Sequence, residues 1–219
     1  MAQQAGSSSD RDLAPRAERE AATPPATVPL PSIADPGPLG LAAFALTTFV
    51  LSFYNAGLVG EAGEPIVFGL ALAYGGVAQF AAGLWEFRTG NTFGATAFCS
   101  YGAFWISFWA LETFFADDIP ASSLGTAAGL YLIAWGIFTF YMWIASFRTT
   151  AAINLVFLLL WITFILLGIG DAIGNTTISQ AGGYVGIVTA LAAWYASFAV
   201  VTNSTFGRSV VPVRPLKKE

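Results

Sequence analysis

Six long apolar stretches dominate this chain and limit what it can fold into. They lie at about residues 39–58, 65–85, 93–114, 124–147, 149–170 and 179–202. Each stretch supplies the roughly 20 residues that a helix needs to cross a bilayer. Only 10% of the residues are charged, whereas soluble domains carry about 25%. The sequence therefore predicts an all-α membrane protein with six transmembrane helices.

The two ends of the chain differ in composition from this apolar region. Residues 1–34 are rich in Ala, Pro and Ser, carry mixed charges and contain no apolar run typical of a signal peptide. We expect them to form a disordered cytoplasmic tail. Residues 35–206 are predicted to form the six-helix transmembrane domain, and residues 207–219 a cytoplasmic C-terminal tail.

The basic residues predict how the helices are oriented. All nine Lys and Arg residues lie in the N-terminal tail, in the links after the second and fourth stretches, or in the C-terminal tail. The links after the first, third and fifth stretches carry only acidic charges. Because basic residues concentrate on the cytoplasmic side, both termini are predicted to be cytoplasmic.

An internal repeat is also visible. Arg88, Arg148 and Arg208 are separated by 60 residues each, and every one of them follows an even-numbered stretch. Gly69 and Phe80 match Gly129 and Phe140 at the same interval. This spacing favours three helical hairpins arranged around a pore within each protomer. Coincidence among apolar residues is the alternative interpretation.

The missing residue types exclude several kinds of chemistry. The chain has no His, a single Cys at position 99, and lysines only at positions 217 and 218. Catalytic triads and metal sites that use His, thiolate clusters and a buried Schiff-base lysine are therefore excluded. We expect no enzymatic activity, no cofactor, no bound metal and no nucleic-acid partner.

Polar residues within spans are costly, so they are the first candidates for a solute pathway. A Ser or Thr side chain could instead donate a hydrogen bond to a carbonyl of its own helix and have no part in a pathway. Because no Lys or Arg lies in the middle of a span, the path would bind anions weakly, which suits fast permeation of a small solute. The candidates are Thr47, Thr48, Asn55, Gln79, Asn91, Thr92 and Asn175.

A proline-rich motif leads into the first stretch. Its two prolines predict an irregular backbone that lines a water-filled mouth, although a helix that starts with Pro in its first turn is the alternative. The motif consists of Asp35, Pro36, Gly37, Pro38, Leu39, Gly40 and Leu41.

These motifs resemble those of the acetate/succinate transporter family (AceTr), which includes bacterial succinate–acetate permeases. Asp35 and Gly37 replace an Asn and an Ala of the family's signature, and Tyr54 stands where bacterial relatives often have His. The resemblance covers about residues 34–212. Besides residues 35–41, it rests on residues 47–57, 74–79, 86–88, 90–94, 100–105 and 206–208.

The resemblance implies a plasma-membrane homohexamer surrounded by lipid, with a pathway for acetate and similar small carboxylates, succinate included, through each protomer. It assigns a narrow hydrophobic constriction to Phe44, Tyr101 and Leu160, where the Tyr101 hydroxyl could also bind a carboxylate. Ordinary core packing is the alternative for these three residues. An acetate-sensing or signalling membrane protein that transports little is the alternative function.

Overall fold

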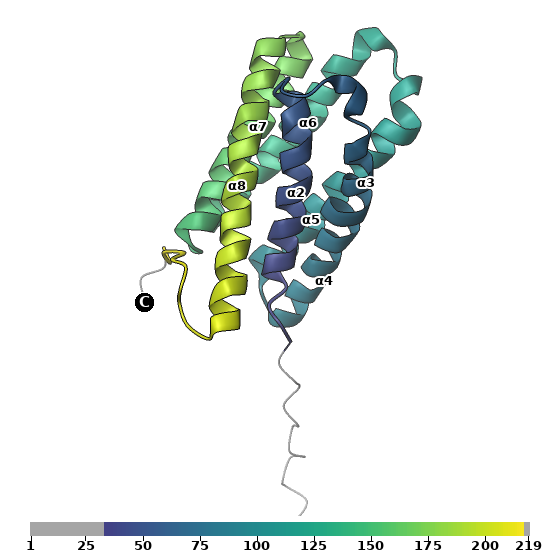
Figure 1. Cartoon of the computed structure of the whole chain (residues 1–219). Coiled ribbons are helices and arrows are strands. Elements are labelled where there is room, and N and C mark those ends of the chain that lie inside the picture. The colour runs from purple at the N-terminus through teal and green to yellow at the C-terminus, as the bar shows by residue number, and fades with distance from the viewer. Residues whose placement is uncertain (1–32, 217–219) are drawn as a thin grey trace, which may run out of the picture. The chain divides into compact units, whose positions relative to one another are not determined.

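The computed structural model describes residues 33–216, so the predicted N-terminal tail lies almost entirely outside the described residues. Within this range every regular element is a helix, apart from one isolated β-bridge. Five of the helices are long and apolar enough to cross a membrane. The predicted all-α membrane fold is therefore confirmed for the described part of the chain (Figure 1).

The helices follow the apolar stretches closely. One predicted span is divided into three consecutive segments by a π-helix, and another continues into a short π-helix. α5 is 19 residues long, but it is not among the five candidate spans, so a sixth span remains a prediction. The elements are α2 (Gly37–Asn55), η1 (Glu61–Gly63), α3 (Ile66–Leu72), η2 (Ala73–Ala78), α4 (Gln79–Thr89), α5 (Thr92–Ala110), η3 (Leu111–Phe115), η4 (Ala116–Asp118), α6 (Ala121–Ser146), α7 (Ala151–Ile173) and α8 (Thr176–Phe206).

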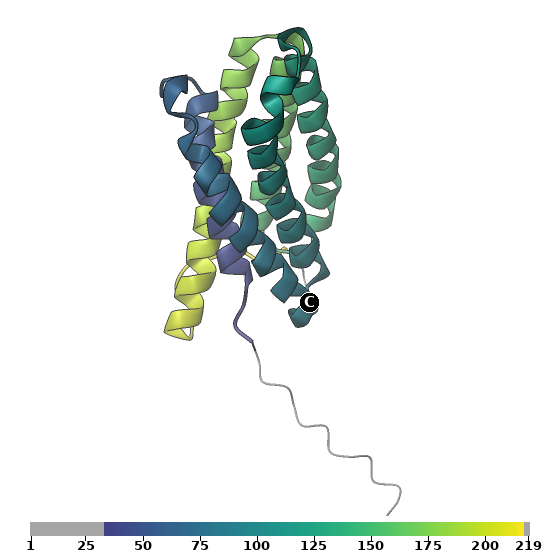
Figure 2. The ribbon, with the colours of Figure 1, turned by 90° about the vertical axis from the view of Figure 1, so that its right-hand side faces the viewer.

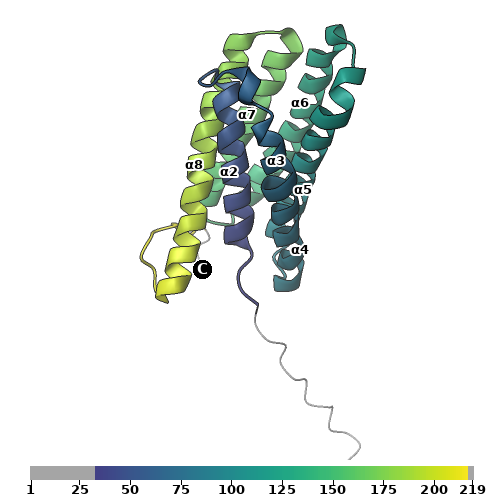
Figure 3. The ribbon, with the colours of Figure 1, turned by 45° about the vertical axis from the view of Figure 1, so that its right-hand side comes forward.

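The long helices pack side by side (Figures 2 and 3), and the contacts between them close a ring. α8 packs between α2 and α7, and α6 packs on the other side of α7. α2 also packs against η2 and α4, which pack against α5. The ring is loosest between α5 and α6, which make few backbone contacts with each other although they are consecutive. α2, α5 and α7 thus occupy alternate positions around the ring.

Small residues allow the close approach of neighbouring helices. A Cβ atom on Gly183 of α8 would overlap the backbone of Ala56, which follows α2. A Cβ atom on Gly129 of α6 would stand 2.6 Å from the carbonyl oxygen of Gly168 of α7. Such contacts bring backbones together in lipid, where hydrophobic attraction between helices is weak.

The part of the predicted C-terminal tail that the structure describes packs against the helices. Residues 208–216 fold back from the end of α8 onto the turn between α6 and α7. The Ala151 amide donates to the Arg214 carbonyl at 2.8 Å, and the Leu216 amide donates to the Thr149 carbonyl at 2.9 Å. The Asn203 side chain binds the backbone of Val210 and Val211. The segment therefore covers the ends of three helices.

Candidate functional site

A cavity of about 210 Å³ lies within the ring and is here called the outer cavity. Its walls come from α2, α5, α6 and α7, at the place where α5 and α6 are loosely packed. Aromatic rings make up much of the wall, among them Phe104, Phe108 and Tyr131. Phe44 and Leu160 also line it. The cavity has the mostly apolar character of small-molecule sites.

Phe44 and Leu160 also line a second, much smaller cavity of about 20 Å³, here called the inner cavity. This volume matches the space that a single water molecule needs, roughly 10–15 Å³ or more. Because the two residues are shared, they lie between the two cavities. Tyr101 lines the inner cavity as well, and its ring centroid is 6.0 Å from that of Phe44. The three predicted constriction residues are therefore together, at 3–5% exposure.

The Tyr101 hydroxyl forms a hydrogen bond with a neighbouring helix. It lies 2.9 Å from the Thr139 hydroxyl of α6, which itself donates to the Trp135 carbonyl at 2.8 Å. Since a carbonyl can only accept, Tyr101 must be the donor to Thr139. Donation from Tyr101 to a carboxylate would therefore require this hydrogen bond to open.

Among the polar pathway candidates, Gln79 is the one that lines the inner cavity. It follows the π-helix η2 directly, is 1% exposed and lines the inner cavity. Its Oε1 atom has no hydrogen-bond partner within the described residues. A π-helical turn shifts the register of the residues after it and is frequent at functional sites. A buried polar group without a partner is rare, and among the polar candidates only Gln79 and Thr48 have one within the described residues.

The two neighbouring threonines of α2 have different roles. Thr47 donates to the Ala43 carbonyl at 3.0 Å, as expected for bonding back to its own helix, and it packs against Gly75. Thr48 lines the outer cavity, is 6% exposed and has no hydrogen-bond partner in the described range. Asn55, one helix turn beyond Ser52, lines the outer cavity as well.

The remaining polar candidates lie at helix starts rather than at a cavity. Asn91 caps α5 by accepting from the Gly94 amide at 3.0 Å, and Asn175 caps α8 by accepting from the Ile178 amide at 3.2 Å. Thr92 is the exposed first residue of α5. These capping bonds satisfy backbone amides that a helix start leaves free.

The proline-rich motif is a helix start, which was the alternative interpretation. Pro36 is the N-cap of α2, and the helix begins at Gly37. Proline is tolerated there because the first amides of a helix have no partner within it. Asp35 accepts from the Gly37 amide at 2.8 Å, and a Cβ atom on Gly37 would stand 2.9 Å from the same oxygen. Asp35 and Gly37, the two residues that differ from the family signature, are therefore in contact.

Sequence reasoning missed two residues. The Trp105 indole lines the outer cavity, is 2% exposed, and its Nε1 has no partner within the described residues. Glu86 is also 2% exposed and accepts from Thr89 and Asn91, each at 3.0 Å. Trp105 lies in a motif that the sequence analysis used, but nothing in a sequence shows whether an indole N–H finds an acceptor.

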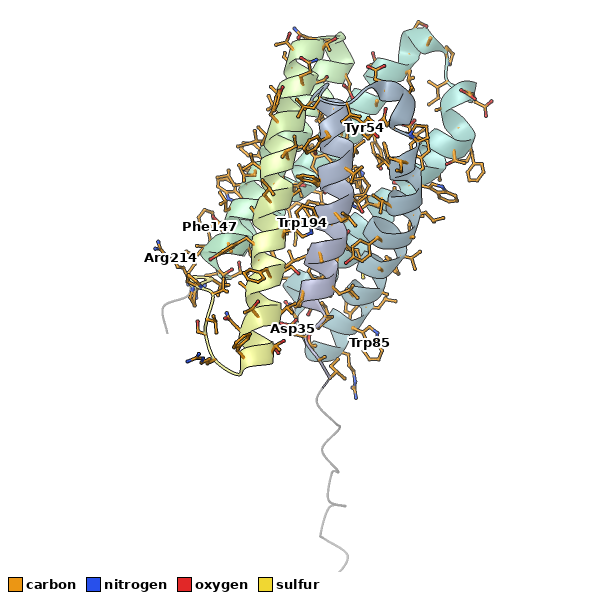
Figure 4. All side chains as sticks on the ribbon, viewed as in Figure 1. Asp35, Tyr54, Trp85, Phe147, Trp194 and Arg214 are labelled. Atoms are coloured by element: carbon orange, nitrogen blue, oxygen red, sulfur yellow. The ribbon has the colours of Figure 1, made fainter. Side chains whose placement is uncertain are left out.

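Acidic side chains gather at the mouth of the outer cavity. Glu64, Glu112 and Asp171 all line it; Glu64 lies between η1 and α3, Glu112 in η3 and Asp171 in α7. Partial burial raises the pKa of Glu64, and the charges of Glu112 and Glu61 raise it further. Figure 4 shows Tyr54 toward this end of the bundle and Asp35 and Trp85 toward the opposite one.

A family model described as the GPR1/FUN34/yaaH family matches residues 19–218. The chain belongs to this family. It is 44% identical over 195 residues to accumulation of dyads protein 2 of Saccharomyces cerevisiae, covering 87% of this chain and 68% of the relative. It is 43% identical over 195 residues to acetate permease A of Emericella nidulans, and the match covers 82% of this chain and 65% of the permease.

A solved structure, that of the bacterial acetate channel SatP, has the same fold. The two superpose with a TM-score of 0.78 at 37% sequence identity, and the match covers 83% of this chain and 99% of that one. This member of the GPR1/FUN34/yaaH family is therefore a multi-pass membrane protein with the helical fold of that channel. The resemblance noted in the sequence is confirmed.

Proposed function

We propose that this protein carries acetate and similar small carboxylates, succinate among them, across the plasma membrane without a catalytic step. The observation that carries the proposal is the pair of cavities separated by Phe44 and Leu160. Membership of a family with an acetate permease and an acetate channel supports the choice of substrate. The deciding experiment is uptake of labelled acetate by liposomes containing the purified protein, with protein-free liposomes as the control.

The geometry suggests how a short solute would pass. From the outer cavity it would meet the narrow point formed by Phe44, Leu160 and the ring of Tyr101. Beyond this point the solute would enter the inner cavity, which Gln79 also lines. A constriction with apolar walls selects by size and can close by excluding water. The inner cavity is close to the size of one water molecule, so the pathway would be closed at this point in the conformation described.

We also propose six spans with both termini in the cytoplasm and a homohexameric assembly. α5 would be the sixth span, because it is as long as α2 and packs beside α4. Glu64, Glu112 and Asp171 lie at one end of the helices and Arg88, Arg148 and Arg208 at the other, as three hairpin repeats of one orientation would require.

Cysteine labelling will test this topology. In a Cys99→Ala background, a reagent that does not cross membranes should label the Ser122→Cys variant on intact cells, because residue 122 lies at the acidic end. The Thr89→Cys variant should be labelled only after the membrane is opened. The reverse pattern would contradict the proposed orientation.

The Asp35 carboxylate should slow the passage of anions at the end of the bundle that carries Arg88, Arg148 and Arg208. The Asp35→Asn variant removes a charge next to the start of α2 and keeps an oxygen that can accept from the Gly37 amide. Because a charge acts over roughly 8 Å at physiological salt, acetate flux should rise severalfold at neutral pH and less at acidic pH. A fall in flux at neutral pH would show that the carboxylate is required.

An acetate-sensing protein with little transport remains the alternative. The shared wall of two cavities favours passage, because a sensor needs only one binding cavity. Absence of labelled acetate flux in liposomes, together with retained binding of acetate, would decide for the sensor.

A further inference from the structure

Residues 208–216, here called the C-terminal strap, are held against the helices along their length. The Tyr195 hydroxyl of α8 donates to the Pro212 carbonyl, and the Asn203 side chain binds the backbone near the beginning of the strap. At the far end Pro215 pairs with Thr150 in a β-bridge. The strap therefore has a defined place beside the start of α7.

The strap is apolar and basic at once. Val210 is 47% exposed and Leu216 is 40% exposed, and Arg208 and Arg214 are exposed as well. Two lysines follow at positions 217 and 218, and no acidic residue lies between Arg208 and the second lysine. A cluster of four basic residues directly after a transmembrane helix is typical of segments that bind anionic phospholipids.

The lengths of the last two helices place the strap near the surface of the membrane. α7 has 23 residues and α8 has 31, and the short turn at Gly174 and Asn175 joins them. Because a helix rises roughly 1.5 Å per residue, α8 extends about 12 Å beyond the start of α7. The strap runs back over this distance to reach Ala151 (Figure 1). Its basic residues therefore lie close to lipid headgroups.

A groove of about 410 Å³ lies between the strap, α7 and α8. Arg214 is the only charged residue that lines it, and the apolar part of its lining includes Leu155, Ala192 and Tyr195. Leu155 is 47% exposed and Tyr195 is 42% exposed, so the groove opens to the outside of the ring. Figure 4 shows Arg214 at the outer edge of the bundle.

The backbone of Arg214 is held in an unfavourable conformation. Its φ angle is 49°, and it is the only residue other than glycine with a positive φ within residues 33–216. Its carbonyl accepts from the Ala151 amide at 2.8 Å, which fixes the residue at the start of α7. Residues with a side chain are rare in this conformation and concentrate where they have a function. Because glycine would fit this backbone better, the presence of Arg indicates a role for its side chain.

We propose that this groove binds an anionic phospholipid from the leaflet at the basic end of the bundle. The Arg214 guanidinium donates to the phosphate, which it can contact through two N–H groups at once. One acyl chain lies along Leu155, Ala192 and Tyr195. The positive charge of the groove complements an anionic headgroup, and its apolar walls lie on two membrane-spanning helices, where a lipid chain is the available apolar partner. This inference does not depend on which solute the protein carries.

The lipids that the purified protein retains will test the charge of the groove. The full-length protein is equilibrated in detergent with equal amounts of phosphatidylglycerol and phosphatidylcholine that carry the same acyl chains, and bound lipids are quantified by mass spectrometry. The wild type should retain phosphatidylglycerol in at least about fivefold excess, and Arg214→Gln should remove most of it, since one basic residue near an anionic lipid contributes about this factor. Arg208→Gln is the matched control, because Arg208 is an exposed residue of the strap that does not line the groove. At physiological salt this control should change the excess by less than about twofold.

A second pair of variants tests the site of the acyl chain. Leu155→Trp fills the groove without changing its charge, so it should abolish the excess of phosphatidylglycerol. Ile169→Trp is the matched control, because Ile169 is a 40% exposed residue of the same helix that does not line the groove. It should retain the excess of the wild type.

Three results would overturn the inference. The first is equal retention of the two lipids by the wild type. The second is an equal loss in Arg214→Gln and Arg208→Gln, which would show a diffuse attraction to the basic tail, and the third is an unchanged excess in Leu155→Trp. If the wild type shows no preference and Leu155→Trp elutes as a smaller particle, the groove is an interface between copies of the chain. Each variant is first checked by its elution and thermal unfolding; if Arg214→Gln does not fold, the wild type and Leu155→Trp decide.

Discussion

The Leu160→Ala variant is expected to pass the larger carboxylates lactate and succinate faster than the wild type does, while acetate still passes. Leu160 is one of two side chains shared by the outer and inner cavities. Shortening it joins the two cavities at their narrowest point. A change of this size in an apolar pocket alters discrimination by about 10- to 200-fold. We therefore expect the ratio of lactate flux to acetate flux in liposomes to rise at least about tenfold.

Two further variants separate this effect from a loss of packing. Leu155→Ala makes the same change on the same helix at a side chain that is 47% exposed, and it should leave the flux ratio unchanged. Tyr101→Phe keeps the ring at the constriction and removes only the hydroxyl that Thr139 accepts, so it should not widen the gap. Leu→Ala substitutions in cores cost about 2–5 kcal/mol. A well-folded Leu160→Ala protein with wild-type size selection would contradict the gate.

The Gly183→Ala variant is expected to lose stability markedly, although it adds only one methyl group. That methyl would overlap the backbone of Asn55 and Ala56, which cannot rotate away as a side chain can. α2 and α8 would have to separate, and overpacking of this kind costs about 1–3 kcal/mol. We expect a lower midpoint of thermal unfolding in detergent and a lower yield of folded protein.

Gly69→Ala is the matched control for this prediction. Gly69 is an exposed residue of α3, and a Cβ atom there would have no neighbour within 4 Å. The same substitution should therefore change stability by less than about 0.5 kcal/mol. Equal losses at the two positions would contradict the assignment of close packing to Gly183.

The glycines show how far a sequence can predict packing. Small residues in apolar stretches indicate that some helices approach closely. Gly69 and Gly183 look alike in such a pattern, yet only Gly183 faces a neighbouring backbone. The direction that each residue faces depends on how its helix is rotated, and the π-helix η2 changes that rotation in the middle of a span. A pattern of residue types cannot contain this information.

The sequence alone determined the membrane location, the approximate bounds of the helices, the separation of acidic and basic ends, and the family. These properties follow from the transfer of side chains between water and lipid, which each segment undergoes largely by itself. The tertiary structure decided that Phe44 and Leu160 lie between two cavities, that Tyr101 donates to Thr139, and that Trp105 has no partner. It also decided that residues 208–216 fold onto the α6–α7 turn. Each of these features joins segments far apart in the chain, so it depends on how the helices pack against one another.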